Sequence, residues 1–272
     1  MKITILLSAL LVVASASSVA RSPIAKLKDI KPESRIVGGS LAEAGQFPYQ
    51  VWLSISSSYG GWDCGGSIID AEWILTAAHC TYGASEIVVI AGSLNIEQLE
   101  DTVQTRTASQ VIIHPQYELT TLKNDISLIR LSSPLQLTYK VWPVPLVDRS
   151  EVNDSFEGEH VIASGWGRTS DAGPAPSQLR YVDMYVESQA ACIGYYGSVT
   201  VTDGVICTYT EYGTKSTCQG DSGGPLVSKA TGHLIGCTSF VSSTGCQSGA
   251  PDGFTRITYY LDWIQQTTGL VV

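Results

Sequence analysis

The sequence lacks a hydrophobic run long enough to span a membrane. A bilayer core requires about 20 consecutive apolar residues, whereas the most apolar segment, residues 3–14, is shorter and leads into small residues. A charged start, a short apolar segment and small residues are typical of a secretory signal peptide. We therefore expect residues 1–20 to be a signal peptide cleaved after Ala16 or Ala20, and the mature protein to be secreted, extracellular and free of membrane.

Metal-binding motifs are also absent from the sequence. The four histidines are scattered, and neither C-x-x-C nor H-E-x-x-H occurs, although these spacings are typical of zinc sites. We expect no metal and no cofactor. The seven cysteines should instead pair in the oxidising environment outside the cell, and their odd number leaves one thiol unpaired.

Basic residues are scarce beyond the N-terminal segment. The chain has 16 Lys and Arg against 25 Asp and Glu, a net charge of −9. Six of the basic residues precede residue 36, so the remainder is more acidic still. Nucleic acids and anionic membranes bind clustered basic residues. Neither is expected as a partner, and the acidic charge is explained by solubility.

The chain divides into a polar segment and a long β-rich part. Residues 21–35 have frequent charges and no hydrophobic period, and are interpreted as an activation propeptide. After them, short β-branched and aromatic runs predict an antiparallel barrel or sandwich, and residues 142–158 are a candidate connection between two halves. The spacing of Ile257, Tyr260, Leu261 and Ile264 before Gly269 predicts an amphipathic C-terminal helix. The predicted strands are 49–55, 73–76, 86–91, 110–113, 126–131, 160–164, 180–186, 225–227, 233–238 and 253–257.

The sharpest local motif is Gly220-Asp221-Ser222-Gly223-Gly224. Its glycines permit a tight turn that exposes a serine hydroxyl and nearby N–H groups. The motif also fits the G-x-S-x-G elbow of α/β-hydrolases, in which the acid and the histidine follow the serine. Only His233 follows Ser222 here, and strands do not alternate with helices. The hydrolase fold is therefore disfavoured.

Two upstream residues can complete a catalytic group with Ser222. A serine needs a base to accept its proton, and the base needs a carboxylate to orient it. His79 lies among small residues beside a cysteine, and Asp125 precedes an alternating apolar strand. Taken alone, such a histidine is usually structural and such an aspartate usually a turn residue. Their occurrence together, in the order His, Asp, Ser, favours a catalytic triad.

Four motifs in order resemble those of the chymotrypsin and trypsin family of serine peptidases. The resemblance runs from Ile36 to the C-terminus, and the ending Tyr260-Leu261-Asp262-Trp263-Ile264 is similar to that of the arthropod brachyurin-like branch. It implies that residues 36–272 form a trypsin-like peptidase domain of two six-stranded antiparallel β-barrels with a C-terminal α-helix. The motifs are Arg35-Ile36-Val37-Gly38-Gly39, Leu75-Thr76-Ala77-Ala78-His79-Cys80, Asn124-Asp125-Ile126-Ser127-Leu128 and Gly220-Asp221-Ser222-Gly223-Gly224-Pro225.

The resemblance implies a serine endopeptidase that works through an acyl-enzyme. Ser222 would attack the scissile carbonyl, His79 would take and return the proton, and Asp125 would orient His79. The N–H groups of Gly220 and Ser222 would bind the oxyanion. Because the triad is unsubstituted, a catalytically silent homologue that only binds partners is disfavoured.

The resemblance also implies activation by proteolysis. Cleavage between Arg35 and Ile36 would create an amine on Ile36, whose buried ion pair with Asp221 would select the active conformation. Cys237 would remain as a buried free thiol. The implied disulfides join Cys64 to Cys80, Cys192 to Cys207 and Cys218 to Cys246.

The implied specificity pocket departs from that of trypsin. Ser216 stands where trypsin-like relatives carry aspartate, and Val241 stands where glycine is usual and narrows the entrance. Asp252 either attracts a basic substrate side chain, titrates upward or turns to solvent, because an unpaired buried carboxylate is costly. Brachyurins carry similar acidic substitutions, so we expect chymotrypsin-like or broad specificity and a digestive role. The pocket residues are Ser216, Thr217, Ser239, Phe240, Val241 and Asp252.

The expected partners follow from this activity. They are protein and peptide substrates, an activating protease and protein inhibitors, and the chain is expected to be a monomer. A protease of a regulatory cascade is an alternative, but no cysteine-rich regulatory segment is present in the sequence. Asn153-Asp154-Ser155 fits an N-glycosylation signal and equally an unmodified polar loop.

Overall fold

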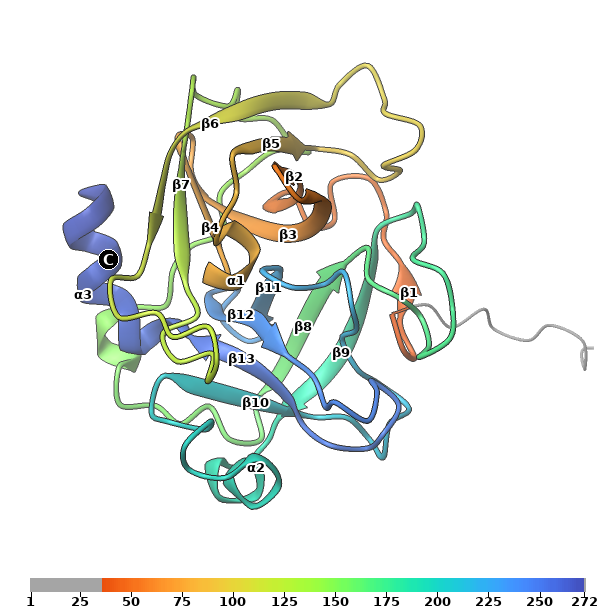
Figure 1. Ribbon diagram of the computed structural model, residues 1–272, viewed down its shortest axis with the longest axis vertical. Helices are drawn as coiled ribbons and strands as arrows, with labels where there is room; N and C mark the ends of the chain where they lie inside the picture. The colour runs from red at the N-terminus through yellow and green to blue at the C-terminus, as the bar shows by residue number, and fades with distance from the viewer. Residues whose placement is uncertain (1–35, 272) are drawn as a thin grey trace, which may run out of the picture. The chain divides into compact units, whose positions relative to one another are not determined.

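The computed structural model describes residues 36–271, which contain two six-stranded antiparallel β-barrels (Figure 1). This architecture confirms the predicted fold. The predicted signal peptide, the propeptide and Arg35 lie outside the described residues.

The first barrel is closed, with strand order β2-β3-β4-β7-β6-β5. Alternating residues of β2, among them Val51, Leu53 and Ile55, are buried inside it, as the two-residue period of a strand requires. The strands are β2 (Gln50–Ser57), β3 (Gly60–Asp70), β4 (Trp73–Thr76), β5 (Glu86–Ala91), β6 (Gln104–Ile113) and β7 (Ser127–Leu131).

The second barrel follows a connection that spans residues 132–159 and includes the short helix η1 (Arg149–Glu151). Its strand order is β9-β10-β13-β12-β11-β8, and pairing of β8 with β9 closes it. The short strand β1 (Ser40–Leu41) adds to the edge of β9. The strands are β8 (His160–Gly165), β9 (Arg180–Val186), β10 (Val205–Tyr209), β11 (Pro225–Ser228), β12 (Leu234–Phe240) and β13 (Asp252–Arg256).

Three α-helices accompany the barrels: α1 (Ala78–Thr81), α2 (Gln189–Tyr196) and α3 (Ile257–Thr268). The four apolar residues that predicted α3 are all buried, and Gly269 ends the helix with a φ of 76°, a left-handed conformation that favours glycine. None of the helices in the described part has the length and hydropathy needed to span a bilayer.

Three strands were not predicted from the sequence, namely β1, β3 and β10, and β6 begins at Gln104 rather than at residue 110. Strand β3 is rich in glycine, which is depleted in strands. Gly65 lies in this strand because the second barrel approaches it: a Cβ there would lie 3.0 Å from the Cα of Gly224. Packing between the two barrels therefore requires a residue without a Cβ atom at position 65. A local sequence pattern does not reveal such a requirement.

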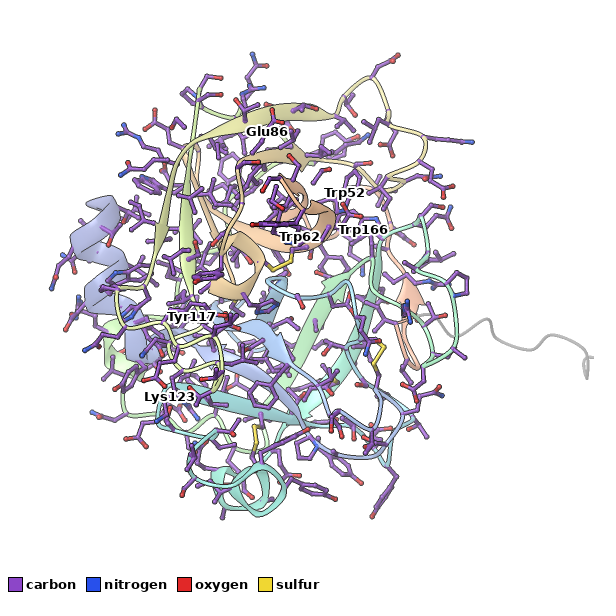
Figure 2. All side chains as sticks on the ribbon, in the orientation of Figure 1. Trp52, Trp62, Glu86, Tyr117, Lys123 and Trp166 are labelled. Atoms are coloured by element: carbon purple, nitrogen blue, oxygen red, sulfur yellow. A yellow bond between two sulfur atoms is a disulfide. The ribbon has the colours of Figure 1, made fainter. Side chains whose placement is uncertain are left out.

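Aromatic side chains and disulfides complete the packing. Trp52 of β2 packs against a cluster that contains Phe47, Trp166 and Leu179 (Figure 2). The three disulfides implied by the family resemblance are present, and Cys237 is free and buried.

Candidate active site

His79 and Asp125 are held together by two hydrogen bonds. His79 lies in α1, directly after β4, and Asp125 lies just before β7. The Nδ1 atom of His79 is 2.8 Å from Oδ2 of Asp125, and the backbone N–H of His79 donates to Oδ1 at 2.9 Å. Asp125 is only 1% exposed. A buried carboxylate beside Nδ1 favours the tautomer that carries its proton there, which leaves Nε2 free to accept one.

Two further hydroxyl groups bind Asp125. Ser239 Oγ donates to Oδ2 at 2.5 Å, and Thr255 Oγ1 donates to the backbone oxygen of Asp125 at 2.6 Å. Ser239 is predicted from the sequence to lie in the pocket wall, and Thr255 is not among the predicted site residues. Both come from strands of the second barrel, more than 110 residues along the chain. No local sequence pattern marks either contact.

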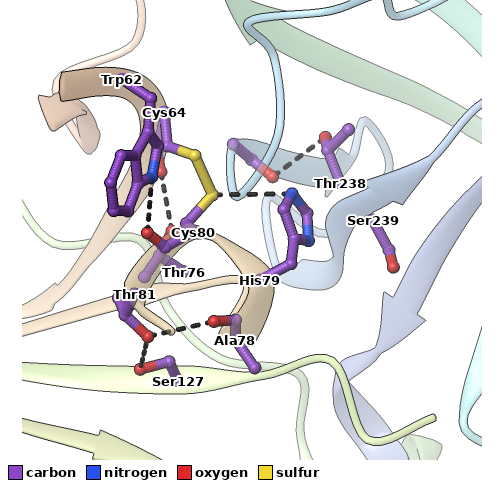
Figure 3. The surroundings of a disulfide bond; sticks show 12 residues. Trp62, Cys64, Thr76, Ala78, His79, Cys80, Thr81, Ser127, Thr238 and Ser239 are labelled. Atoms are coloured by element: carbon purple, nitrogen blue, oxygen red, sulfur yellow. Dashed lines mark hydrogen bonds between the residues drawn. A yellow bond between two sulfur atoms is a disulfide. The ribbon is translucent and has the colours of Figure 1, made fainter. Parts of the chain in front are cut away.

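The His79 ring lies between the Cys64–Cys80 disulfide and Ser239 (Figure 3). Its Nε2 atom is 3.7 Å from the sulfur of Cys80, and the His79 side chain is 23% exposed. Trp62 donates from Nε1 to the backbone oxygen of Cys80 at 2.8 Å. The disulfide and this bond brace one side of a ring that a ligand can still reach.

The loop that carries Ser222 packs against the residues just before His79. Gly223 has a φ of 76°, and a Cβ there would lie 2.1 Å from Thr76 Oγ1 and 3.2 Å from the nitrogen of Ala77. Gly65 links the two segments, because its N–H donates to the Ser222 oxygen at 2.7 Å and its oxygen accepts from Thr76 Oγ1 at 2.8 Å. The motif's glycine thus allows the loop to approach α1. Within residues 36–271 no hydrogen bond joins the Ser222 hydroxyl to the His79 ring.

The N–H groups of Gly220 and Ser222 are available to a ligand. In the described part of the chain neither group donates to a protein acceptor. Gly220 has a φ of 102°, a conformation that only glycine adopts without strain. Two such donors beside a serine hydroxyl can stabilise negative charge on a carbonyl oxygen.

Asp221 lies between Gly220 and Ser222 in this loop, and its side chain is fully buried. Its Oδ1 accepts from the N–H of Gly167 at 2.8 Å, and its Oδ2 accepts from the N–H of Cys218 at 2.9 Å. A Cβ at Gly165 or Gly167 would lie 2.2 or 2.3 Å from a carboxylate oxygen. Burial raises the pKa of Asp221 to about 7, against the lowering effect of the two N–H groups.

The first described residues, Ile36 and Val37, pack near the loop that contains Asp221. Ile36 and Val37 are both buried, and the N–H of Ser216 donates to the oxygen of Val37 at 3.1 Å. The segment that follows Arg35 is therefore joined directly to a residue expected at the floor of the specificity pocket.

Asp252 lies in the interior beside Ser216 and Thr217. It is 1% exposed, and it accepts hydrogen bonds from Ser216 Oγ at 2.8 Å, the Thr217 N–H at 2.6 Å and Thr217 Oγ1 at 3.0 Å. Of the three outcomes left open for Asp252, turning to solvent is wrong, because these donors hold the carboxylate inside. Burial raises its pKa to about 7 although the three donors lower it.

The other residues expected in the pocket lie at or just after the end of β12. Phe240 lies over Gly253, where a Cβ would be 2.2 Å from the ring, and it meets Tyr196 edge-on with centroids 5.1 Å apart. Val241 packs against Cys218 and Cys246. Phe240 is thus fixed on the barrel, and Val241 stands beside the Cys218–Cys246 disulfide.

Two groups of potential metal ligands occur among the described residues. One contains Cys64, His79 and Cys80, and the other contains Asp171, Cys218 and Cys246. All four cysteines are in disulfides, so they are not the thiolates that metals bind. Neither group fits a metal site.

Comparison with known proteins identifies the family. Residues 36–264 match the family described as Trypsin. The chain is 43% identical to Serine protease 1 of Drosophila melanogaster over 90% of its length and 89% of that protein, and 44% identical to Brachyurin of Leptuca pugilator over 86% and 99%. The solved structure of HL collagenase superposes with a TM-score of 0.81 and 38% identity, covering 87% of this chain and all of that one. The chain is a member of the trypsin family of serine proteases, and hence a trypsin-like serine endopeptidase.

Proposed function

We propose that the protein is a secreted zymogen whose peptidase domain, residues 36–272, is activated by cleavage between Arg35 and Ile36. Family membership supplies the reaction class, and the observation that carries the residue assignment is the double contact of Asp125 with His79 beside the Ser222 loop.

The proposed reaction uses the side chains of Ser222, His79 and Asp125. Ser222 Oγ attacks the scissile carbonyl while His79 Nε2 takes its proton, and Asp125 stabilises the imidazolium that forms. The amine then leaves with the proton from His79. Water, deprotonated in turn by His79, hydrolyses the acyl-enzyme and restores Ser222.

The tetrahedral oxyanion is bound by the N–H groups of Gly220 and Ser222. Each such donor contributes about 3 kcal/mol to transition-state stabilisation. Their availability supports this role, because a donor already bonded to the protein would have to break that bond first.

Activation uses the buried Asp221. Cleavage creates a charged amine on Ile36 that can pair with the Asp221 carboxylate, whose charged form is otherwise disfavoured by burial. The Val37–Ser216 hydrogen bond supports coupling of this insertion to the specificity pocket. The signal peptide and propeptide assigned to residues 1–35 complete the zymogen.

The specificity is broad and changes with the charge of Asp252. Its neutral form suits apolar and aromatic side chains, whereas its charged form suits Lys and Arg. Similarity to Brachyurin of Leptuca pugilator supports broad specificity, and such specificity suits a digestive enzyme. Protein inhibitors and an activating protease are the remaining proposed partners.

Labelling with a serine-directed phosphonate tests the assignment. The precursor is cleaved after Arg35 with immobilised trypsin, which is then filtered away, and the labelled residue is identified by mass spectrometry. We expect one label per chain on Ser222 after cleavage and almost none before it. A chain cleaved after Arg35 that remains unlabelled would contradict both the triad and the switch.

A further inference from the structure

One edge of β3 is open next to the Ser222 loop. β2 pairs with Gly60 to Ser67 along one edge, while β4 pairs only with Ser67 to Asp70 along the other. The Gly65 N–H points to this second edge, where it binds the Ser222 oxygen. Alternate residues of an antiparallel strand direct their N–H and C=O to the same edge. The backbone of Asp63 therefore faces the open edge and can pair with an extended peptide.

The Asp63 side chain belongs to the face of β3 that meets the second barrel. Side chains at positions 63 and 65 share a face, and a Cβ at Gly65 would lie 3.0 Å from Gly224 Cα, next to the Ser222 loop. Cys64 belongs to the opposite face, where it forms its disulfide with Cys80. Two residues along a strand correspond to about 7 Å, so Asp63 lies one such step beyond the Gly65–Ser222 contact.

This position is on the leaving-group side proposed for the active site. Ser239, one of the residues assigned to the specificity pocket, lies on one side of His79, and the Cys64–Cys80 disulfide lies on the other (Figure 3). Cys64 attaches the disulfide to β3. A substrate that places its acyl part in the pocket and its leaving amine at His79 must continue past the disulfide toward β3. Its first residues after the scissile bond then pass the open edge at Asp63.

The charge of Asp63 has no protein partner. No Lys, Arg or His within residues 36–271 forms an ion pair with it, although its side chain is exposed. The residue of β2 that pairs with Asp63 is the neutral Ser54. Partial desolvation raises the pKa of the carboxyl group, and a nearby cation would relieve the cost of burying its charge.

We propose that Asp63 is a specificity-determining residue that favours Lys or Arg within the first two residues after the scissile bond. This inference rests on the proposed function, since it assigns the direction in which substrate crosses the triad. A partly exposed charge pair gives a preference of about fivefold in kcat/KM over a neutral residue, and the preference declines as salt is added.

Peptides that share one acyl-side sequence and differ only after the cut bond test the proposal. They carry Lys, Gln or Glu at the first or the second position, and mass spectrometry identifies the bond cut and the rate. Enzyme is activated with immobilised trypsin, and active sites are counted with the phosphonate. We expect the ratio of kcat/KM for Lys over Glu to exceed 1 in the native enzyme, to fall toward 1 in Asp63→Asn and to drop below 1 in Asp63→Lys.

A matched charge change separates a local effect from the acidity of the whole protein. Glu157 is an exposed carboxylate before β8 in the other barrel, and Glu157→Gln should keep the native Lys-to-Glu ratio. An unchanged ratio in Asp63→Lys, or an equal fall in Glu157→Gln, would overturn the proposal. Hydrolysis of an anilide substrate, which has no residue after the bond, reports separately whether the native protein is an enzyme.

Discussion

The buried carboxylate of Asp252 should make the choice of substrate depend on pH. Burial raises the pKa of Asp252 to about 7, so the group changes charge around neutral pH. In the proposed pocket, the charged form should attract a Lys or Arg side chain, and the neutral form should accept an apolar one. The ratio of kcat/KM for a Lys substrate over a Leu substrate should therefore rise with pH. Because both substrates use the same triad, the protonation of His79 cancels from the ratio.

The size of the change follows from that pKa. With a pKa of about 7, the charged fraction rises from about 9% at pH 6 to about 91% at pH 8. If only the charged form binds Lys productively, the ratio rises about tenfold between these pH values. The assay uses two anilide substrates that differ only in the residue before the bond, at constant ionic strength.

Asp252→Asn provides the control for this measurement. The amide keeps the size of the side chain and can still accept from Ser216 or Thr217, but it does not titrate. We expect a low ratio that is constant from pH 6 to pH 8. A native ratio that is also constant over this range, or a pH dependence that survives in Asp252→Asn, would refute the role given to this carboxylate.

Three other substitutions probe the surroundings of the active site. Ser239→Ala removes the hydroxyl that donates to Asp125 at 2.5 Å. The kcat/KM per titrated active site should fall about tenfold, which corresponds to the loss of one hydrogen bond to a charged group. An undiminished kcat/KM would count against a catalytic role for this contact. Gly167→Ala places a Cβ 2.3 Å from the Asp221 carboxylate, so the melting temperature and the fraction of titratable active sites should both drop. In the control Gly194→Ala, the added Cβ meets nothing within 4 Å, and both quantities should stay at their native values. Burial raises the pKa of Asp221 from 3.8 to about 7 in the folded state. The contribution of this group to the stability of the uncleaved chain is therefore fully present below pH 3.8 and is lost as pH rises through about 7. The resulting change in the free energy of unfolding is about 4 kcal/mol. Asp221→Asn should remove that pH dependence in urea unfolding, and equal slopes for the two proteins would show that the carboxylate is not the cause.

The sequence predicted the parts of the fold that local patterns encode. The period of α3 follows from burial of one face, and nine of the ten predicted strands coincide with strands of the structure over most of their length because β-branched runs lie between turn residues. Strand β3 escaped prediction because it is rich in glycine, and one of these glycines, Gly65, is required by contact with Gly224 of the other barrel. Such a contact between distant segments leaves no periodic signal in either of them.

The same distinction applies to the active site. The motifs around His79, Asp125 and Ser222 are local and were found from the sequence together with the family resemblance. The hydroxyl groups that hold Asp125, from Ser239 and Thr255, are supplied by distant strands and carry no motif. The fate of Asp252 also required the structure, because only the donors around it decide whether a carboxylate can remain buried.

His79 and Ser222 should act as one catalytic unit, and a double-mutant cycle measures whether they do. Ser222→Ala, His79→Ala and the double variant are cleaved after Arg35 with immobilised trypsin, and their hydrolysis of one anilide substrate is compared. Groups that act together are lost together, so all three variants should retain the same residual rate within about a factor of three. If the activity lost in the double variant instead equals the product of the two single losses, the two residues act independently and do not form a catalytic unit.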